Sequence, residues 1–257
     1  MKKKCAIFTI VKDEDYFLPI WIKHYKKYFN NEDIYVLDHD SVDGSTSNLD
    51  VNITKVHRDL AFDHQWLVDT VQAYQQQLLE QYEVVIFAEA DELLYSIERP
   101  LNELIDAFIA DPNQPYLTCN GYEVIHNIDK EKSITPEDSI IENRNEWFKY
   151  FPYDKTLISK IPLKWVWGFH DPIGTPRNYS HELFMFHLHR VDFELMLKRH
   201  NRRANKWTIK DDGPHAGAYH KIGDRDGVLK YFYNPEGLQT IPIETIPQNH
   251  KLALNGI

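Results

Sequence analysis

The sequence predicts an α/β fold in which a mainly parallel sheet is flanked by helices. Short apolar runs alternate with stretches of helical periodicity over the first 115 residues, a pattern typical of parallel strands joined by crossover helices. Polar, acid-rich segments follow four of these runs. The 257-residue chain is 42% hydrophobic and 13% aromatic, which is sufficient for a sizeable core.

Four apolar runs are predicted to be strands of the first half. The first, residues 5–11 (CAIFTIV), is expected to be buried. The next are residues 33–38 (DIYVLD), the short 53–57 (ITKVH) and 84–88 (VVIFA). We expect these four strands to form the parallel part of the sheet.

Three helices are predicted among these strands. Residues 18–29 repeat apolar side chains on one helical face. Asp63 is a suitable N-cap for a second helix, because residues 65–82 continue with apolar positions at helical spacing. Pro100 suits the first turn of a third helix over residues 100–110.

After residue 115 the pattern changes to strand candidates separated by polar stretches. Residues 181–190 (HELFMFHLHR) alternate like a strand, and residues 192–203 (DFELMLKRHNRR) have the pattern of a short helix. Beyond Asn205 there is little periodicity, and no element is predicted there.

No internal repeat or linker divides the chain, so we expect a single domain over residues 1–257. Residues 1–115 are expected to bind a ligand common to many enzymes. Residues 116–257 are expected to supply the specific contacts.

Charge, cysteine content and the amino terminus exclude several classes. The formal net charge of -10 and the pI of about 5.7 argue against a nucleic-acid partner. The two cysteines, Cys5 and Cys119, lie in apolar runs and indicate neither a disulfide framework nor a zinc site. The apolar stretch after MKKK is too short for a signal peptide or a transmembrane segment. We therefore expect a soluble, cytoplasmic protein.

Polar residues follow each predicted strand of the first half. These segments are 12–15 (KDED), 38–45 (DHDSVDGS), 57–59 (HRD) and 89–92 (EADE). In an open parallel sheet, ligands bind beyond the carboxyl ends of the strands. Each segment alone is also compatible with ordinary turn chemistry, because Asp, Ser and Gly are common in turns. The four together predict a binding site at this edge of the sheet.

The acidic segment 89–92 gives the most specific prediction. If strand alternation continues here, Glu89 and Asp91 project to the same side, where they could share a divalent cation, Mn²⁺ or Mg²⁺, with a ligand diphosphate. Glu92 is predicted to point the other way, as a structural partner or as a group in an acceptor site. The alternative is that these carboxylates cap the following segment and stay solvated.

Three stretches carry a family resemblance: FTIVKDEDYFLPIWIKHYKKYF, IYVLDHDSVDGST and VVIFAEADELL. Together they resemble the amino-terminal half of glycosyltransferases with the GT-A fold, and are most similar to family two and the group labelled family 92 or DUF23-like. The resemblance covers about the first 95 residues. It implies a nucleotide-sugar donor, usually with uridine diphosphate, bound across the first three strand ends, and a metal ion at the fourth.

The resemblance also implies roles for individual residues. Asp91 corresponds to the direct metal ligand, and Glu89 to the first acid of an Asp-x-Asp motif, near the ribose and the metal. The implied nucleotide-sugar contacts are Glu14, Asp38, Asp40, Ser41, Asp43, Asp59, Glu89 and Lys155. Two positions depart from the family pattern, because Asp13 stands for the usual Asn and Glu89 for the usual Asp.

Histidines of the second half are candidates to complete the metal shell. His187 and His189 lie on one face of the alternating segment 181–190, and His170 ends the sequence WVWGFH. Each is also compatible with a hydrogen-bonded structural role. The enzymes that the chain resembles commonly recruit a late histidine, which favours His189 first and His187 second.

Glycosyl transfer also needs a base to take the proton of the acceptor hydroxyl. Asp171, Glu182 and Glu92 are the candidate bases, with Asp192 as a further carboxylate, and the Pro/Gly-flanked loop around Asp171 favours that residue. A basic run near residue 200 is either a solvated helix face or a diphosphate contact; its members are Arg190, Lys198, Arg202 and Arg203.

We therefore expect a metal-dependent, inverting glycosyltransferase that uses a UDP-sugar and a glycan or other hydroxyl acceptor. A nucleotidyltransferase is an alternative, but FTIVKDED lacks the glycine-rich loop that normally cradles a triphosphate. A metal-dependent hydrolase would need a second histidine-rich cluster beside HLHRVD. A catalytically decayed carbohydrate-binding protein would also use the aromatic residues between Tyr116 and Trp167, but intact Glu89 and Asp91 favour an enzyme.

Overall fold

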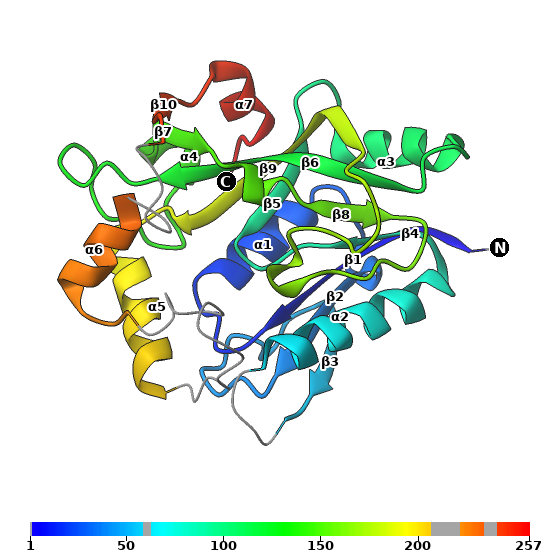
Figure 1. Ribbon diagram of the computed structural model, residues 1–257, viewed down its shortest axis with the longest axis horizontal. Coiled ribbons are helices and arrows are strands. Elements are labelled where there is room, and N and C mark those ends of the chain that lie inside the picture. Colours follow the sequence, from blue (N-terminus) through cyan, green and yellow to red (C-terminus); the bar gives the residue numbers. More distant parts are fainter. Residues whose placement is uncertain (1, 59–62, 207–221, 234–240) are drawn as a thin grey trace.

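The structure, a computed structural model, describes residues 2–58, 63–206, 222–233 and 241–257 (Figure 1). Its strands are β1 (Lys3–Val11), β2 (Ile34–His39), β3 (Asn52–Val56), β4 (Tyr82–Phe87), β5 (Glu92–Ser96), β6 (Tyr116–Ile125), β7 (Glu146–Lys149), β8 (Thr156–Ser159), β9 (Tyr179–Arg190) and β10 (Glu244–Thr245). Its helices are α1 (Phe17–Tyr25), α2 (His64–Leu79), α3 (Leu101–Ala110), α4 (Ile140–Asn143), α5 (Phe193–Lys206), α6 (Arg225–Tyr233) and α7 (Gln248–Ala253). Three short 3-10 turns are η1 (Asn31–Asp33), η2 (Phe151–Tyr153) and η3 (Trp167–Phe169).

The predicted α/β fold is confirmed. Within the described residues the strands form one sheet, in the order β10-β7-β6-β8-β4-β1-β2-β3, with β9 bridging β6 and β5. Helices α2 and α3 lie on either side of β1 and β4 in the view of Figure 1. The sheet therefore continues from the first half of the chain into the second.

The four strands predicted for the first half form the parallel part of this sheet. Strand β1 pairs in parallel with β2 and with β4, and β2 pairs in parallel with β3. The apolar runs are buried because helices cover both faces of the sheet, and Ile7, Phe8 and Ile86 are fully buried. The carboxyl ends of these strands therefore lie along a common edge.

The three helices of the first half begin near their predicted starts; α1 and α2 end earlier than predicted, whereas α3 ends at Ala110 as predicted. The Asp63 side chain caps α2, where it accepts hydrogen bonds from the backbone N–H groups of Gln65 (2.9 Å) and Trp66 (3.1 Å). Helix α2 ends at Leu79 and Tyr82 begins β4, so the predicted helix ran into the next strand. Helix α1 likewise ends at Tyr25.

The second half adds antiparallel and mixed pairing. Strand β8 joins β4 and β6 in antiparallel pairing, β9 runs parallel to β6, and β5 is antiparallel to β9. The predicted strand over 181–190 is β9, and the predicted helix after it is α5.

Strand β5 was not predicted, and its position changes the geometry of the acidic segment. Strand β4 ends at Phe87, and a turn follows in which the N–H of Glu92 donates to the carbonyl of Glu89 at 2.9 Å. Strand alternation therefore does not extend through Glu89 and Asp91. Their side chains are instead directed by the turn and by the partners described below.

In the part of the chain that the structure describes, no helix combines the length and apolar character needed to cross a membrane.

Candidate active site

The loops after β1 and β2 are tied to each other by hydrogen bonds. The N–H of Asp13 donates to Oγ of Ser41 at 3.0 Å, and the N–H of Val42 donates to Oδ1 of Asp13 at 2.8 Å. The N–H of Glu14 donates to Oγ of Ser45 at 3.3 Å. Asp13 itself has a positive φ of 53°, a conformation that Asp tolerates better than most residues. These contacts give the edge a defined backbone shape.

Asp38 organises the loop after β2 from within. Its fully buried carboxylate accepts hydrogen bonds from the N–H of Ser41 at 2.8 Å and from the hydroxyl of Thr46 at 2.5 Å, and it pairs with Lys55. Burial alone would raise the pKa of Asp38, but hydrogen bonds from Lys55, Thr46 and Ser41 together lower it to about 2. Asp38 is therefore ionised and holds the loop in place.

We expect Asp38→Asn to lower the free energy of unfolding by about 2 kcal/mol at pH 7. The pKa of Asp38 is lower in the folded than in the unfolded chain, so its contribution is complete above about pH 4 and is lost as the pH falls toward 2. Urea denaturation of both proteins at pH 7 and pH 3 measures this. If wild type and variant differ in free energy of unfolding by the same amount at both pH values, the loss comes from packing rather than from the charge of Asp38.

The remaining predicted contacts of this edge are more exposed. Asp40 has a positive φ of 52° and accepts a 2.8 Å hydrogen bond from Nδ1 of His57. Asp43 accepts hydrogen bonds from the N–H (2.9 Å) and the hydroxyl (2.6 Å) of Ser45, as in an ordinary turn. Asp59 lies outside the described residues.

Asp91 is joined to the first strand end by an arginine from α5. Arg199 donates from Nη1 to Oδ2 of Asp91 at 3.2 Å and from Nη2 to Oε2 of Glu14 at 2.9 Å. All three residues are buried. His189 of β9 adds its Nδ1 at 3.8 Å from the same oxygen of Asp91. Residues from the loop after β1, from β9, from α5 and from the acidic turn therefore meet at one point.

Ionic contacts determine the charge state of Asp91. Burial alone would raise the pKa of Asp91, but His189 and Arg199 hold it well below its ordinary value. Glu14 and Asp91 likewise raise the pKa of Arg199 against the effect of burial. Asp91 is thus ionised, and Asp91 and Glu14 share one guanidinium.

Glu89 and Glu92 share a different cation, Lys155, which follows η2. The ammonium of Lys155 lies 2.7 Å from Oε2 of Glu89 and 2.5 Å from Oε1 of Glu92. The N–H of Glu89 also donates to Oε2 of Glu92 at 2.9 Å. The prediction that Glu92 faces away from Glu89 was therefore wrong, because the turn brings both carboxylates onto Lys155.

Burial separates the roles of these three residues. Glu92 and Lys155 are buried, whereas the Glu89 side chain is 35% exposed and faces the solvent side of the group. Burial raises the pKa of Glu92, although Lys155 opposes this effect. Burial alone would lower the pKa of Lys155, but Glu89 and Glu92 raise it. Lys155 is therefore a permanent positive charge beneath Glu89.

The three candidate histidines have different surroundings. Nδ1 of His187 lies 2.5 Å from Oε2 of the buried Glu123, and Nδ1 of His170 lies 2.6 Å from the carbonyl of Pro152. Burial, with a smaller contribution from Lys155, lowers the pKa of His170 to about 4. The ring of His189 lies 6.1 Å from that of His187, and its buried Nε2 has no hydrogen-bond partner among the described residues.

The predicted metal ligands do not converge on a cation site in this arrangement. Among the described residues, no group of three or more His, Cys, Asp or Glu side chains could hold a metal ion. Asp91 is paired with Arg199 and Glu89 with Lys155. The donor set therefore does not fit a divalent cation as it stands, and the cation remains a prediction.

The structure separates the candidate bases. Asp171 is 48% exposed and forms a two-pronged ion pair with Arg177, at 2.7 Å (Nε) and 3.1 Å (Nη2). Glu182 is buried against Arg99. Because Glu182 lies five residues before His187 on β9, the two are separated by roughly 16 Å along the strand. Glu182 is therefore not brought to the acidic turn.

Asp192, the further carboxylate, has a structural role. It pairs with the buried Arg144 at 3.1 Å and accepts a 3.1 Å hydrogen bond from the N–H of Leu195 in the first turn of α5.

Sequence reasoning missed Arg199, the residue that joins the two strand ends. The predicted basic run did not include Arg199. Two members of that run, Lys198 and Arg202, instead lie near Asp15, with Nζ and Nη1 at 3.6 Å and 3.9 Å from its carboxylate oxygens. The helical period gave a usable signal, because Arg199 lies three residues after the buried Met196 and faces inward with it. Glu123 of β6, which pairs with both His187 and Arg190, had no local signal.

No family model matches the chain, and no curated protein matches it. Among solved structures, it is similar to the mannosyltransferase PcManGT from Pyrobaculum calidifontis in complex with GDP-Man and Mn2+, at 18% identity and a TM-score of 0.33 over 46% of this chain and 36% of that chain. It is similar to S. aureus TarS 1-349 in complex with UDP-GlcNAc, at 13% identity and a TM-score of 0.41 over 90% and 72% of the two chains.

A third similar structure is the mannosyltransferase Ktr4p from S. cerevisiae in complex with GDP, at 13% identity and a TM-score of 0.28 over 49% and 42% of the two chains. The match spans little more than a third of the length of the Pyrobaculum protein. All three TM-scores lie below 0.5, so the residues of this chain, rather than these likenesses, carry the functional proposal.

Proposed function

We propose that this protein is a GT-A type glycosyltransferase that moves a sugar from a nucleoside diphosphate sugar to a hydroxyl acceptor. The observation that carries the proposal is the contact of Arg199 with both Glu14 and Asp91. It joins the end of β1 to the acidic turn after β4, the two places where the resemblance puts the nucleotide and the leaving diphosphate. A purely structural turn would not need three buried charges at a ligand-binding edge.

The nucleoside is proposed to bind over the ends of β1 and β2. The mutual hydrogen bonds of the two loops and the ionised, buried Asp38 provide a rigid backbone frame there. Glu14 and Ser41 are part of this frame through their own contacts. Uracil is the proposed base, on the resemblance of the IYVLDHDSVDGST stretch.

Two cationic side chains lie where the leaving diphosphate is proposed to bind. Arg199 and Lys155 lie beside the acidic turn, each shared between two carboxylates. Because these carboxylates already balance both cations, a leaving diphosphate would need further positive charge, which a divalent cation would supply. A divalent cation held by Asp91, with His189 nearby, remains our proposal from the resemblance, and the present donor arrangement does not support it by itself.

Asp171 remains the proposed base, with single in-line displacement and inversion as the resemblance implies. Its exposed, loop-borne carboxylate can reach solvent, whereas Glu92 and Glu182 are buried in ion pairs. The nucleotidyltransferase alternative gains no support, because the loop after β1 has no glycine. A test of donor binding and turnover distinguishes the transferase from a catalytically decayed carbohydrate-binding protein.

A thermal-shift screen tests the donor. We expect UDP or a UDP-sugar to raise the melting temperature in a concentration-dependent way, because ligands that bind only the folded state stabilise it. ADP, GDP and CMP serve as matched nucleotides, and each is run with Mn²⁺, with Mg²⁺ and with EDTA. A larger shift with Mn²⁺ would support the cation. If no nucleoside diphosphate or nucleotide sugar shifts the melting temperature under any condition, the proposed function is rejected.

A further inference from the structure

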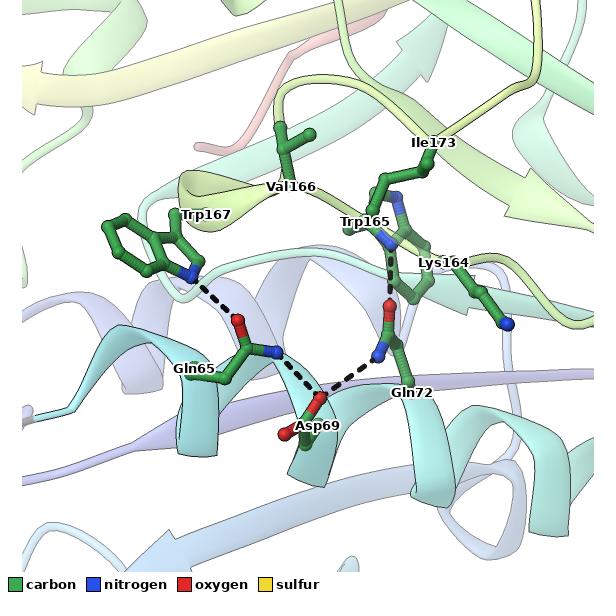
Figure 2. Close-up of a pocket in the computed structure, with 8 residues that line it drawn as sticks. All are labelled: Gln65, Asp69, Gln72, Lys164, Trp165, Val166, Trp167 and Ile173. Atoms are coloured by element: carbon green, nitrogen blue, oxygen red, sulfur yellow. Dashed lines mark hydrogen bonds between the residues drawn. The ribbon is translucent and has the colours of Figure 1, made fainter.

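A pocket of about 600 Å³ lies between α2 and the loop over residues 164–173 (Figure 2). Small-molecule sites in proteins typically occupy about 300–1,000 Å³. Three polar side chains of α2 line one wall, and aromatic and aliphatic side chains of the loop line the other. No residue predicted from the sequence to bind the donor or a metal lies in this lining.

Two glutamines hold the walls of the pocket at a fixed separation. Oε1 of Gln72 accepts a 2.7 Å hydrogen bond from the backbone N–H of Trp165. Oε1 of Gln65 accepts a 3.0 Å hydrogen bond from the indole Nε1–H of Trp167. Both bonds are drawn in Figure 2. The pocket is therefore formed before any ligand enters, which lowers the entropic cost of binding.

Asp69 offers an acceptor at the centre of the polar wall. Its Oδ1 accepts hydrogen bonds from Nε2 of Gln65 at 2.8 Å and of Gln72 at 3.5 Å. Its Oδ2 has no hydrogen-bond partner in the described part of the chain. The two glutamines thus orient the carboxylate and leave one oxygen for a ligand hydroxyl.

Trp167 offers an oriented aromatic surface opposite this carboxylate. One side of its indole stacks on the ring of His64, with 5.6 Å between centroids and 21° between planes. Its Nε1–H is used by Gln65, yet the residue is 39% exposed. Its sequence neighbour Val166 is 39% exposed, and Ile173, which lies next to Trp165 in Figure 2, is 62% exposed. A rigid, accessible indole next to an apolar rim is suited to a flat ligand with an apolar face.

We propose that this pocket binds a neutral pyranose unit of a saccharide. The C–H face of a pyranose packs on an indole ring, and its hydroxyl groups donate to a carboxylate oxygen. The Asp69 carboxylate in the lining disfavours a phosphate or nucleotide at the same place. Lys164 at the rim is exposed and could instead attract an acidic sugar, which the experiment below distinguishes.

The pocket is placed to hold the acceptor of the proposed transfer. Trp66, next to Gln65 in the first turn of α2, has its ring 4.5 Å from that of His39 at the end of β2. On the loop side, Phe169 packs on Phe87 at the end of β4, with 4.6 Å between ring centroids. The two elements that form the pocket therefore also pack on the ends of β2 and β4. The acceptor role rests on the proposed function, whereas saccharide binding itself does not.

Fluorine NMR of protein labelled with 5-fluorotryptophan tests the binding. The chain has six tryptophans, and the resonance missing from Trp167→Phe identifies that of Trp167. Methyl glycosides of glucose, galactose, mannose and N-acetylglucosamine, their short oligomers, glucuronate and UDP are the probes. We expect at least one neutral glycoside to shift the Trp167 resonance saturably.

Calorimetry of variants with the best neutral probe gives the second measurement. Trp167→Ala should weaken binding about tenfold, the scale of a lost aromatic contact. Asp69→Asn keeps an oxygen for the two glutamines but replaces the ligand acceptor with a donor, and should weaken binding several-fold. Asp106→Asn, an exposed change on α3, is the matched control and should leave binding unchanged.

The possible outcomes separate this inference from the proposed function. Failure of every neutral probe to shift the resonance, or a shift with glucuronate or UDP alone, overturns the saccharide assignment. Saccharide binding without any response to nucleotides in the thermal-shift screen would retain the pocket and reject the transferase. Nucleotide binding that persists in Trp167→Ala, while the glycoside no longer binds, would support both.

Discussion

Replacing Asp91 with asparagine is expected to lower the rate of sugar transfer by about 10²–10³-fold, the scale seen when one oriented electrostatic contact of an active site is lost. Asp91 is the carboxylate on which Arg199 and His189 both converge, so the change removes the negative charge that orients them. Asparagine has nearly the same shape, and one of its amide hydrogens would face Arg199. The measurement is UDP release from a UDP-sugar in the presence of an acceptor.

Controls for this variant distinguish a catalytic effect from unfolding. Asp106→Asn removes an exposed carboxylate that pairs with Lys4 on the surface, and should retain full activity. Asp91→Asn should keep the circular dichroism spectrum of the wild type. If it keeps full activity with and without Mn²⁺, then Asp91 neither positions Arg199 for the reaction nor binds a cation.

Replacing Lys155 with methionine is expected to lower the free energy of unfolding by about 3–5 kcal/mol at pH 8, the range observed when one partner of a buried ion pair is removed. Methionine has a similar volume, so the packing is largely kept. Lys155 lies 2.5 Å from Oε1 of the fully buried Glu92, which would be left without its cation. Guanidinium denaturation measures the change, and the comparison is valid if both proteins unfold with the same m-value.

The pH dependence of this variant has a defined sign. Burial already raises the pKa of Glu92 in the wild type, and loss of Lys155 raises it further. A carboxyl with a higher pKa in the folded than in the unfolded chain gains stability as the pH falls through that value. The deficit of Lys155→Met should therefore be smaller at pH 5 than at pH 8.

A second substitution tests the same pair directly. Lys155→Met combined with Glu92→Gln removes the buried charge and should recover much of the lost stability. If the double variant is no more stable than Lys155→Met alone, the penalty does not come from an unpaired Glu92. The comparison also shows whether Lys155 is needed for donor binding apart from its role in folding.

The sequence alone was sufficient for the parallel half of the fold. Apolar runs and helical periodicity are local patterns, and the four strand ends followed from them because parallel strands must present their carboxyl ends together. The buried Asp38 was found at such an end for the same reason. Strand β4 ends at Phe87, close to the predicted end at residue 88, but strand alternation was wrongly extended into the turn that follows, because an apolar run does not show how the chain continues after it. Strand β5 consequently went unrecognised.

Only the tertiary structure decided which charges meet. Arg199 and Glu14 are 185 positions apart, and the contact of Lys155 with Glu89 spans 66 positions. The indole of Trp167 donates a hydrogen bond to Gln65, which is 102 positions away in the sequence. Short-range patterns record which side chains prefer burial, whereas the partner of a buried charge depends on the element that packs opposite it. The sequence therefore indicated the strand-end edge at which we propose the site, and the packing of α5 and β9 decided which charged side chains meet there.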